Sequence, residues 1–301
     1  MEPKIATFSG HRDCVYALCR GPKENEFFSA GADGAVVLWN VDDTEKGKMI
    51  VQVPSSIYAI HYFPETNTLL IAANRDGLHL IDLESGLESW KMSSPTTNWF
   101  RIEALNSEQI ILSGSSGSLA NLNSTSWTIN WLATPVSDNR AIAVHQNSGE
   151  IAFGNSIGNI GIFKSSDSNP LLFQAIHKNT VFGLAFYPDG ERLISCGRDG
   201  HLVLWTRYGT GNWHPQVEIP AHLFGIHDVK IHPEKPILAT CSMDKTLKIW
   251  DAENLKLLRV LDKTRHAGHG HSVNQVLWLG KRELLLSCSD DRTISAWDIY
   301  R

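Results

Sequence analysis

The chain has 301 residues, of which 42% are hydrophobic and 20% charged, a composition that excludes a disordered protein and supplies a large core. Its net charge of −5 at pH 7 argues against binding to nucleic acid or to an anionic membrane through the overall field of the protein. No apolar run approaches the roughly 18 residues of a membrane span, and the first residues do not resemble a secretion signal, so we expect a cytoplasmic protein.

A repeat of about 40 residues dominates the sequence. Seven segments, from AVVLWN at 35–40 to TISAWD at 293–298, share one apolar pattern, and their anchor residues lie 41 to 47 residues apart. This spacing is typical of a four-stranded propeller blade, so seven anchors predict seven blades. The anchors are Trp39, Ile81, Leu122, Phe163, Trp205, Trp250 and Trp297.

Each repeat reads as short strands separated by turns rather than as helices. In the fifth repeat, for example, turns at 188–190 and 199–200 divide three apolar stretches. A fourth strand comes from the segment that leads into the next repeat, as at 49–53, 89–92, 128–132, 171–175 and 216–220. We therefore predict an all-β, seven-bladed β-propeller of four-stranded antiparallel blades. It forms a single domain, residues 1–301, with repeats at approximately 4–42, 48–84, 87–125, 128–166, 170–208, 215–253 and 255–301.

Short polar motifs accompany three of the anchors. A Gly-His or Ala-His pair precedes a Trp-Asn or Trp-Asp pair, at 10–11 and 39–40, 221–222 and 250–251, and 270–271 and 297–298. This pattern resembles the WD-repeat family across essentially the whole chain.

The resemblance implies a hydrogen-bonded tetrad of His, Ser or Thr, Asp and Trp in each complete repeat. Such a set satisfies buried polar groups that would otherwise cost about 1 to 3 kcal/mol each. In all four matching repeats the Asp lies six residues before the Trp and four after the hydroxyl residue. The expected tetrads are His11, Ser29, Asp33 and Trp39; His177, Ser195, Asp199 and Trp205; His222, Thr240, Asp244 and Trp250; and His271, Ser287, Asp291 and Trp297.

The middle repeats depart from this pattern. Ser116 and Ile157 stand where the third and fourth repeats should have Asp, and the second repeat keeps Asp76 but is one residue short. Replacing the whole polar set by apolar residues leaves nothing buried unpaired, so we keep these repeats as blades.

The two ends of the chain are expected to share one blade. The chain stops four residues after Trp297, so the last repeat lacks an outer strand, and Lys4–Phe8 is an unclaimed strand before His11. The family resemblance implies that these residues pair beside the C-terminal blade, which removes an exposed edge.

The motifs do not indicate catalysis or a cofactor. A His, Ser and Asp set that recurs in four repeats has a structural role, whereas a catalytic triad is normally made once. Three histidines at 266–271 are better explained by a loop insertion than by a metal site, because no Cys or carboxylate completes a ligand set. Cys196, Cys241 and Cys288 share one repeated position and are expected as strand thiols. We predict no enzyme, no cofactor and no metal.

A partner surface is expected around the start of the innermost strands. The family resemblance implies that a partner binds on the face that carries the tetrad His and Asp. It also implies that one residue of each repeat forms an inner ring on this face: Tyr16, Tyr58, Phe100, Ile142, Phe182, His227 and Asn274. Aromatic and Arg side chains are typical of binding hot spots and predict a groove for an extended segment with acidic and apolar residues. The alternative is that these rings pack between blades. The predicted partner-binding residues are Tyr16, Tyr58, Arg75, Phe100, Arg140, Phe182, Arg198, His227, Met243 and Asn274.

The family resemblance also implies which residues flank this inner ring, and we expect these residues to be exposed as well. They are Cys14, Ala32, Ser56, Asn98, Ser115, Ser156, Thr180, Gly225, Ser272 and Asp290.

The leading hypothesis is a monomeric propeller that acts within a larger complex as a scaffold for a protein or peptide. Two alternatives stay open: a propeller enzyme or metal or small-molecule binder that uses the central funnel, and a nucleic-acid-associated propeller. The first needs a cluster of carboxylates or histidines and the second a basic stripe, which the composition does not indicate.

Overall fold

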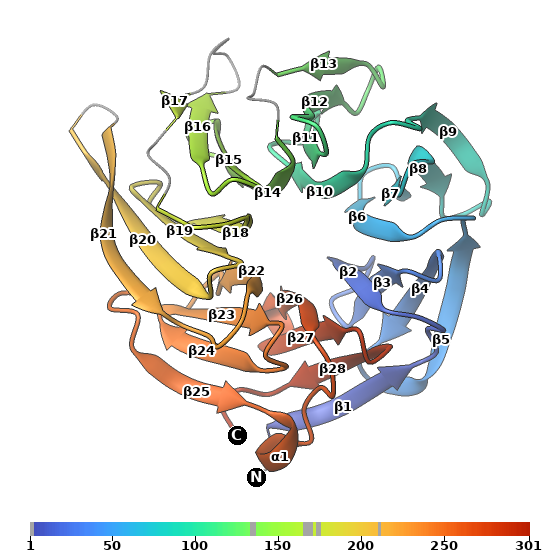
Figure 1. Cartoon of the computed structure of the whole chain (residues 1–301). Coiled ribbons are helices and arrows are strands. Elements are labelled where there is room, and N and C mark those ends of the chain that lie inside the picture. Colours follow the sequence, from blue (N-terminus) through green and yellow to red (C-terminus); the bar gives the residue numbers. More distant parts are fainter. Residues whose placement is uncertain (1–2, 133–136, 165–170, 173–175, 210–211) are drawn as a thin grey trace. The chain divides into compact units, whose positions relative to one another are not determined.

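The computed structural model describes residues 3–132, 137–164, 171–172, 176–209 and 212–301. They form seven four-stranded antiparallel sheets, which confirms the predicted seven-bladed β-propeller (Figure 1). We number the blades one to seven by their innermost strands in chain order.

The blades follow one another along the chain, and the innermost strand of each blade is named first. Blade one contains β2 (Val15–Arg20), β3 (Glu26–Gly31), β4 (Ala35–Asn40) and β5 (Asp43–Gln52). Blade two contains β6 (Ile57–Phe63), β7 (Thr68–Ala73), β8 (Gly77–Asp82) and β9 (Glu88–Ser93). Blade three contains β10 (Trp99–Ala104), β11 (Gln109–Gly114), β12 (Leu119–Asn123) and β13 (Ile129–Trp131). Blade four contains β14 (Asn139–His145), β15 (Glu150–Asn155), β16 (Ile160–Lys164) and β17 (Leu171–Leu172).

The remaining blades keep the same order. Blade five contains β18 (Val181–Phe186), β19 (Arg192–Gly197), β20 (His201–Tyr208) and β21 (Asn212–Pro220). Blade six contains β22 (Ile226–Ile231), β23 (Ile237–Ser242), β24 (Leu247–Asp251) and β25 (Leu257–Leu261). Blade seven contains β26 (Val273–Leu279), β27 (Leu284–Ser289), β28 (Thr293–Trp297) and, as its outer strand, β1 (Lys4–Ser9).

The outer strands agree with the segments expected from sequence. Of the strand expected at 171–175, Leu171 and Leu172 are seen, and 173–175 lie outside the described residues.

Blade seven is built from both ends of the chain. Strand β1 pairs antiparallel with β28, with Thr7 opposite Ser295 and Phe8 opposite Ile294. Phe8 is fully buried, and its ring meets Phe27 edge to face at 5.1 Å. The expected closure by the N-terminal strand is therefore confirmed.

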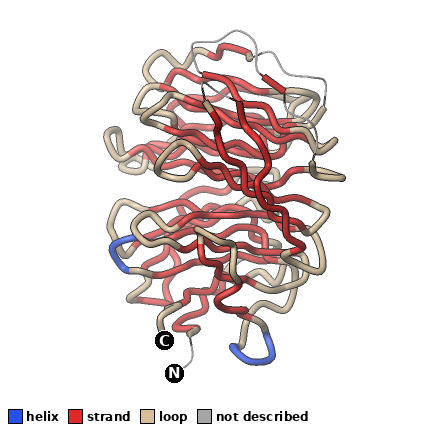
Figure 2. Tube along the Cα trace, turned by 90° about the vertical axis from the view of Figure 1, so that its left-hand side faces the viewer, coloured by secondary structure: helices blue, strands red, loops and turns tan. Residues whose placement is uncertain are grey.

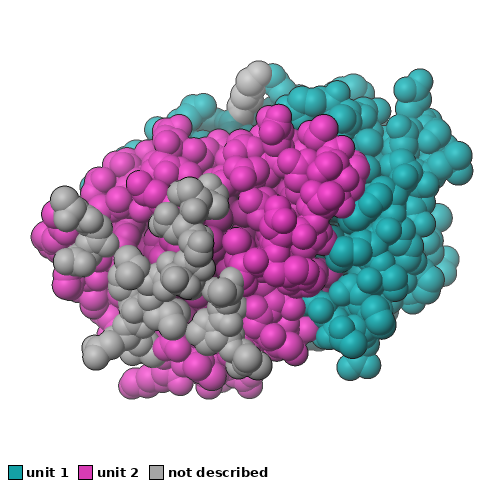
Figure 3. Space-filling view, turned by 90° about the horizontal axis from the view of Figure 1, so that it is seen from above, with its two compact units in different colours: residues 1–98, 232–301 teal, residues 99–231 magenta. Residues whose placement is uncertain are grey.

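The chain divides into two compact units (Figure 3). One consists of residues 1–98 and 232–301, and the other of residues 99–231. In the first unit, apolar side chains such as Val15, Phe27 and Leu286 pack between neighbouring sheets. In the second, Ala141 and Leu184 belong to a core cluster shared by blades four and five.

Helices contribute little to the described chain (Figure 2). The loop insertion expected near 262–270 contains α1 (Lys263–His266), which Asp262 caps by accepting a hydrogen bond from the backbone N–H of Arg265. The helix ends at His266, and its C-cap residue, Ala267, has a left-handed φ of 51°. A 3-10 turn, η1 (Gly280–Arg282), joins β26 to β27.

Candidate functional site

Blade one shows how a complete tetrad is connected. The Nε1 of Trp39 donates to Ser29 Oγ at 2.8 Å, and His11 Nε2 lies 2.7 Å from the same oxygen. His11 Nδ1 lies 3.0 Å from Asp33 Oδ2. In the tautomer of a neutral imidazole that matches these contacts, Nδ1 donates to Asp33 and Nε2 accepts from the Ser29 hydroxyl. Asp33 also accepts the backbone N–H of Arg12, so the tetrad fixes the loop before β2.

Blade five shows the same connections, and blade six shows one of them, the hydrogen bond from the Trp indole to the hydroxyl residue. In blade five, Trp205 Nε1 donates to Ser195 Oγ at 2.8 Å, and His177 lies within hydrogen-bond distance of Ser195 and Asp199. In blade six, Trp250 Nε1 donates to Thr240 Oγ1 at 2.9 Å. His222 is buried.

In blade seven the tetrad histidine is His269, so the assignment of His271 is wrong. His269 Nε2 lies 2.8 Å from Ser287 Oγ, and His269 Nδ1 lies 2.9 Å from Asp291 Oδ2, whereas His271 is exposed. The spacing contains the signal, since each tetrad histidine lies 28 residues before its Trp, and 28 residues before Trp297 is His269. Gly268-His269 and Gly270-His271 are both Gly-His pairs, so this motif alone does not choose between the two histidines, whereas the spacing does.

Hydrogen bonds lower the pKa of two tetrad aspartates, Asp199 and Asp291. Burial alone would raise the pKa of Asp291, but hydrogen bonds from His269, Thr293 and the backbone of Gly270 hold that pKa below its ordinary value. The pKa of Asp199 is lowered in the same way, against its burial, by His177.

Blade two uses a substitute network. Its turn aspartate, Asp76, lies 3.0 Å from Nε2 of the buried His79 on β8 and 2.9 Å from Lys91 Nζ on β9. The other nitrogen of His79 lies 2.5 Å from Glu88. The imidazole therefore comes from a strand rather than from the preceding loop, which sequence reasoning missed because the pattern differs from the other repeats.

Blade four replaces the polar set by apolar rings, as expected. Phe153 and Phe163 occupy the hydroxyl and Trp positions, and their ring centroids lie 6.2 Å apart. Nothing at those two positions needs a hydrogen-bond partner.

The start of the innermost strands carries a repeated irregularity. In β2, β6, β10, β14, β18 and β26 the register with the next strand shifts at the second residue, as a β-bulge does. The corresponding second residue of β22 is His227. We call these positions the bulge residues: Tyr16, Tyr58, Phe100, Arg140, Phe182, His227 and Asn274.

The fourth bulge residue is Arg140 and not Ile142, which corrects the expected inner ring. Ile142 is 4% exposed and packs in a core cluster with Phe153. Counting back 23 residues from the anchor Phe163 gives Arg140, and the same count gives Tyr16 from Trp39. Arg140 therefore takes the position that aromatic rings hold elsewhere.

In the first compact unit, three bulge residues form one cluster with the backbone around them. The rings of Tyr16 and Tyr58 lie 5.5 Å apart, and both residues are partly exposed. Asn274 Nδ2 donates to the carbonyl of Val15 and to Asp290 Oδ1, each at 2.8 Å.

In the second compact unit, an arginine lies over two phenylalanines. The guanidinium of Arg140 is 3.8 Å from the ring centroid of Phe100 and 5.9 Å from that of Phe182. Phe182 meets the ring of His227 edge to face at 5.5 Å. Phe100 is only 9% exposed, so its ring serves mainly as the surface on which Arg140 rests.

Three flanking positions that were expected to be exposed instead connect neighbouring blades. The side chains of Cys14, Ser56 and Thr180 donate to the carbonyls of Asp290, Ala32 and Ser156, respectively. Burial, with Asp290 nearby, raises the pKa of the Cys14 thiol to about 11, so it is not a thiolate at neutral pH. These three side chains therefore make contacts between blades.

The remaining predicted contact residues lie at turns and are exposed. They are Arg75, whose φ of 56° is left-handed, Arg198, and Met243, which is 42% exposed. Neither Arg75 nor Arg198 has an ion-pair partner among the residues that the structure describes.

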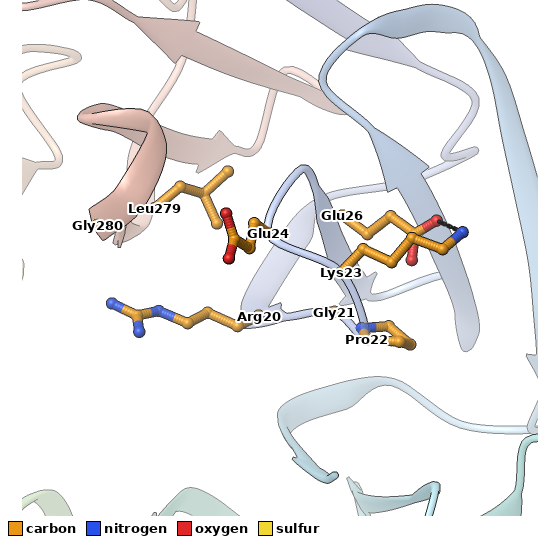
Figure 4. Close-up of a pocket in the computed structure, with 8 residues that line it drawn as sticks. All are labelled: Arg20, Gly21, Pro22, Lys23, Glu24, Glu26, Leu279 and Gly280. Carbon is orange, nitrogen blue, oxygen red and sulfur yellow. Dashed lines mark hydrogen bonds and ion pairs between the residues drawn. The ribbon is translucent and has the colours of Figure 1, made fainter.

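A separate pocket lies at the other end of β2 (Figure 4). Arg20, Lys23, Glu24 and Glu26 line it together with Leu279 and neighbouring backbone. Lys23 forms an ion pair with Glu26 at 3.0 Å, and Arg20 donates to the carbonyl of Trp278. These three charged residues of the pocket therefore have partners within the protein.

Comparison with known families agrees with the repeat geometry. The family model described as WD domain, G-beta repeat matches residues 2–40, 169–206, 213–251 and 257–298, more than half of the chain. The chain belongs to the WD-repeat family. The matched WD repeats coincide with the blades for which a tetrad was expected, and the unmatched blades two to four are those in which the pattern is altered or replaced.

Several known WD-repeat proteins resemble parts of the chain. The nuclear distribution protein PAC1 of Candida tropicalis is 34% identical over 33% of this chain and 19% of its own length. The target of rapamycin complex subunit LST8 of Mus musculus is 26% identical over 46% of this chain and 43% of its own length. The nucleoporin SEH1-A of Xenopus laevis is 32% identical over 26% of this chain and 22% of its own length. The chain thus spans less than half the length of each of these relatives.

Among the described residues, no helix is long and apolar enough to cross a membrane.

Proposed function

We propose that the protein is a non-enzymatic, cytoplasmic interaction scaffold that binds a protein or peptide segment through its bulge residues. One observation carries the proposal: the same irregular position of the innermost strands holds Tyr, Phe, Arg, His or Asn, although the residue before it is buried. Tyr16, Tyr58, Arg140, Phe182 and His227 keep part of their surface in solvent. Packing within the blades does not require such residues.

The chemistry of these residues favours a segment with apolar and acidic side chains. Aromatic rings bury a large area at a small cost in side-chain entropy, and Arg pairs with carboxylates through two parallel hydrogen bonds. Arg75 and Arg198 add exposed cations that no described carboxylate neutralises. Since the whole chain carries a net charge of −5, these local cations must provide the attraction for an acidic segment.

The relatives support a scaffold role. Two of them are named as a complex subunit and as a nucleoporin, and the names of the three relatives do not describe a reaction. We infer that this propeller also acts as a monomer within a larger assembly.

Selection from a displayed library of random peptides tests the proposal. The full-length protein is the bait, and the matched control is the triple variant Tyr58→Ala, Phe182→Ala, Arg198→Ala. We expect peptides with acidic and apolar side chains to be enriched on the wild type and lost on the variant. Peptides that the variant retains equally well would place the site elsewhere.

A further inference from the structure

Two ion pairs connect innermost strands of the second compact unit that are far apart in sequence. On β10, Arg101 and Glu103 are two residues apart, and on β22, Asp228 and Lys230 are two residues apart. Arg101 Nη2 lies 3.7 Å from Asp228 Oδ1, and Lys230 Nζ lies 3.2 Å from Glu103 Oε1. Glu103, with Asp228, raises the pKa of Lys230, so Lys230 is a cation.

Arg101 also makes two hydrogen bonds to backbone carbonyls. Its Nη2 donates to the carbonyl oxygen of Phe182 at 3.2 Å and to that of His227 at 3.0 Å. Both acceptors are bulge residues, on β18 and on β22. One guanidinium from blade three thus holds the backbone of two blades at the positions where their side chains enter the proposed binding site.

Close packing of β18 against β22 allows a single nitrogen to reach both carbonyls. An added Cβ at Gly183 would lie 3.1 Å from the backbone nitrogen of Val229 and 3.3 Å from the Cα of Asp228. Gly183 directly follows Phe182, so Phe182 and His227 lie side by side. The edge-to-face contact of Phe182 with His227, at 5.5 Å between ring centroids, follows from this arrangement.

We propose that Arg101 is a positioning residue of the binding site: it fixes the backbone at Phe182 and His227 and so orients their rings for the ligand. This inference rests on the proposed function, which supplies the ligand. Asp228 is 3% exposed and faces Arg101, so it holds the guanidinium in register with the two carbonyls. Arg101 itself is not expected to touch the ligand.

The Glu103–Lys230 pair provides a matched control. It joins the same two strands and also contributes to stability, but the carboxylate of Glu103 only accepts hydrogen bonds and so cannot bond to a bulge carbonyl. The test compares Arg101→Met and Arg101→Lys with Glu103→Gln in the full-length protein. Arg101→Lys keeps a positive charge beside Asp228, but its side chain is shorter and lacks the planar fork, and it covers the case in which Arg101→Met does not fold.

Two readouts are measured for each variant. The first is the dissociation constant for the peptide that the library selection enriches most on the wild type. The second needs no ligand: the ring resonances of Phe182 in protein labelled at phenylalanine, assigned with Phe182→Leu and compared with those of the buried Phe8.

We expect the Arg101 variants to weaken peptide binding at least tenfold and to shift the Phe182 resonances, while those of Phe8 stay unchanged. Glu103→Gln should lower the melting temperature without changing either readout. Equal effects of the Arg101 and Glu103 variants would reduce Arg101 to a structural role, and unchanged Phe182 resonances in Arg101→Lys would overturn the inference. If no peptide binds the wild type, the proposed function fails, but the Phe182 resonances still decide whether Arg101 positions the bulge.

Discussion

A chain of hydrogen bonds runs in one direction through the tetrads of blades one, five and seven. The Trp indole donates to the hydroxyl, the hydroxyl to the imidazole and the imidazole to the Asp carboxylate, as in Trp39, Ser29, His11 and Asp33. Because each member supplies the partner that the next one needs, removing any member leaves a buried polar group unsatisfied.

The pair His269 and His271 gives a sharp test of this arrangement. We expect His269→Ala to lower the free energy of unfolding by about 2 kcal/mol, because Ser287 and Asp291 lose their buried partner. His271→Ala, at an exposed position two residues away, should change it by less than about 0.5 kcal/mol. Urea titration of both variants measures the difference, and equal effects would refute the assignment of His269.

The lowered pKa values of Asp199 and Asp291 predict how stability depends on pH. In the unfolded chain these carboxyl groups take up protons near pH 3.9, before they do so in the folded protein. Their contribution is therefore present above about pH 4 and is lost as the pH falls below it. Urea midpoints should decline between about pH 5 and pH 2, and the deficit of Asp291→Asn relative to the wild type should shrink over that range. A deficit that is constant with pH would contradict the expectation.

At the scale of elements, the loss of β1 should destabilise blade seven, which the two ends of the chain share. Deleting residues 1–8 removes most of the partner of β28 and the buried Phe8, so we expect a sharp decrease in melting temperature. The substitution Ile5→Ala, at a side chain that is 39% exposed, is the control and should have little effect. Calorimetry measures both, and an unchanged melting curve of the deletion variant would contradict the role of β1.

The elements were largely predictable, because strand pattern and repeat length are local properties of the sequence. The anchors and turns indicated seven blades, and the unclaimed Lys4–Phe8 indicated the shared last blade. Two residues were assigned to the wrong position of their repeat. Two successive Gly-His pairs precede β26 and the second was chosen, which gave His271 in place of His269, and a two-residue offset in the fourth repeat put Ile142 in place of Arg140.

The finer geometry of the site could not be predicted in this way. Arg101 bonds to carbonyls 81 and 126 residues later, and no repeat spacing encodes such a contact. The network of His79 was equally hidden, since its imidazole lies on a strand, whereas a tetrad histidine lies in the loop before the innermost strand. The hydrogen bonds of Cys14, Ser56 and Thr180 to neighbouring blades likewise required coordinates to be seen.

At the scale of the whole molecule, every repeat uses one framework with one variable position. The blades share their strand order, and the innermost strands of six blades show a bulge at the second residue, whereas the residue at this position changes among the blades from Tyr to Phe, Arg, His or Asn. A constant framework with varied partly exposed side chains is what a binding surface requires.

Calorimetric titration of the selected peptide tests this account most directly. The proteins compared are the wild type, the triple variant at Tyr58, Phe182 and Arg198, and a double variant, Lys23→Ala with Glu24→Ala, in the pocket at the other end of β2. We predict that the triple variant binds about 100-fold more weakly, a loss of about 3 kcal/mol, while the pocket variant binds like the wild type. Full affinity in the triple variant, or loss of binding in the pocket variant alone, would contradict the account.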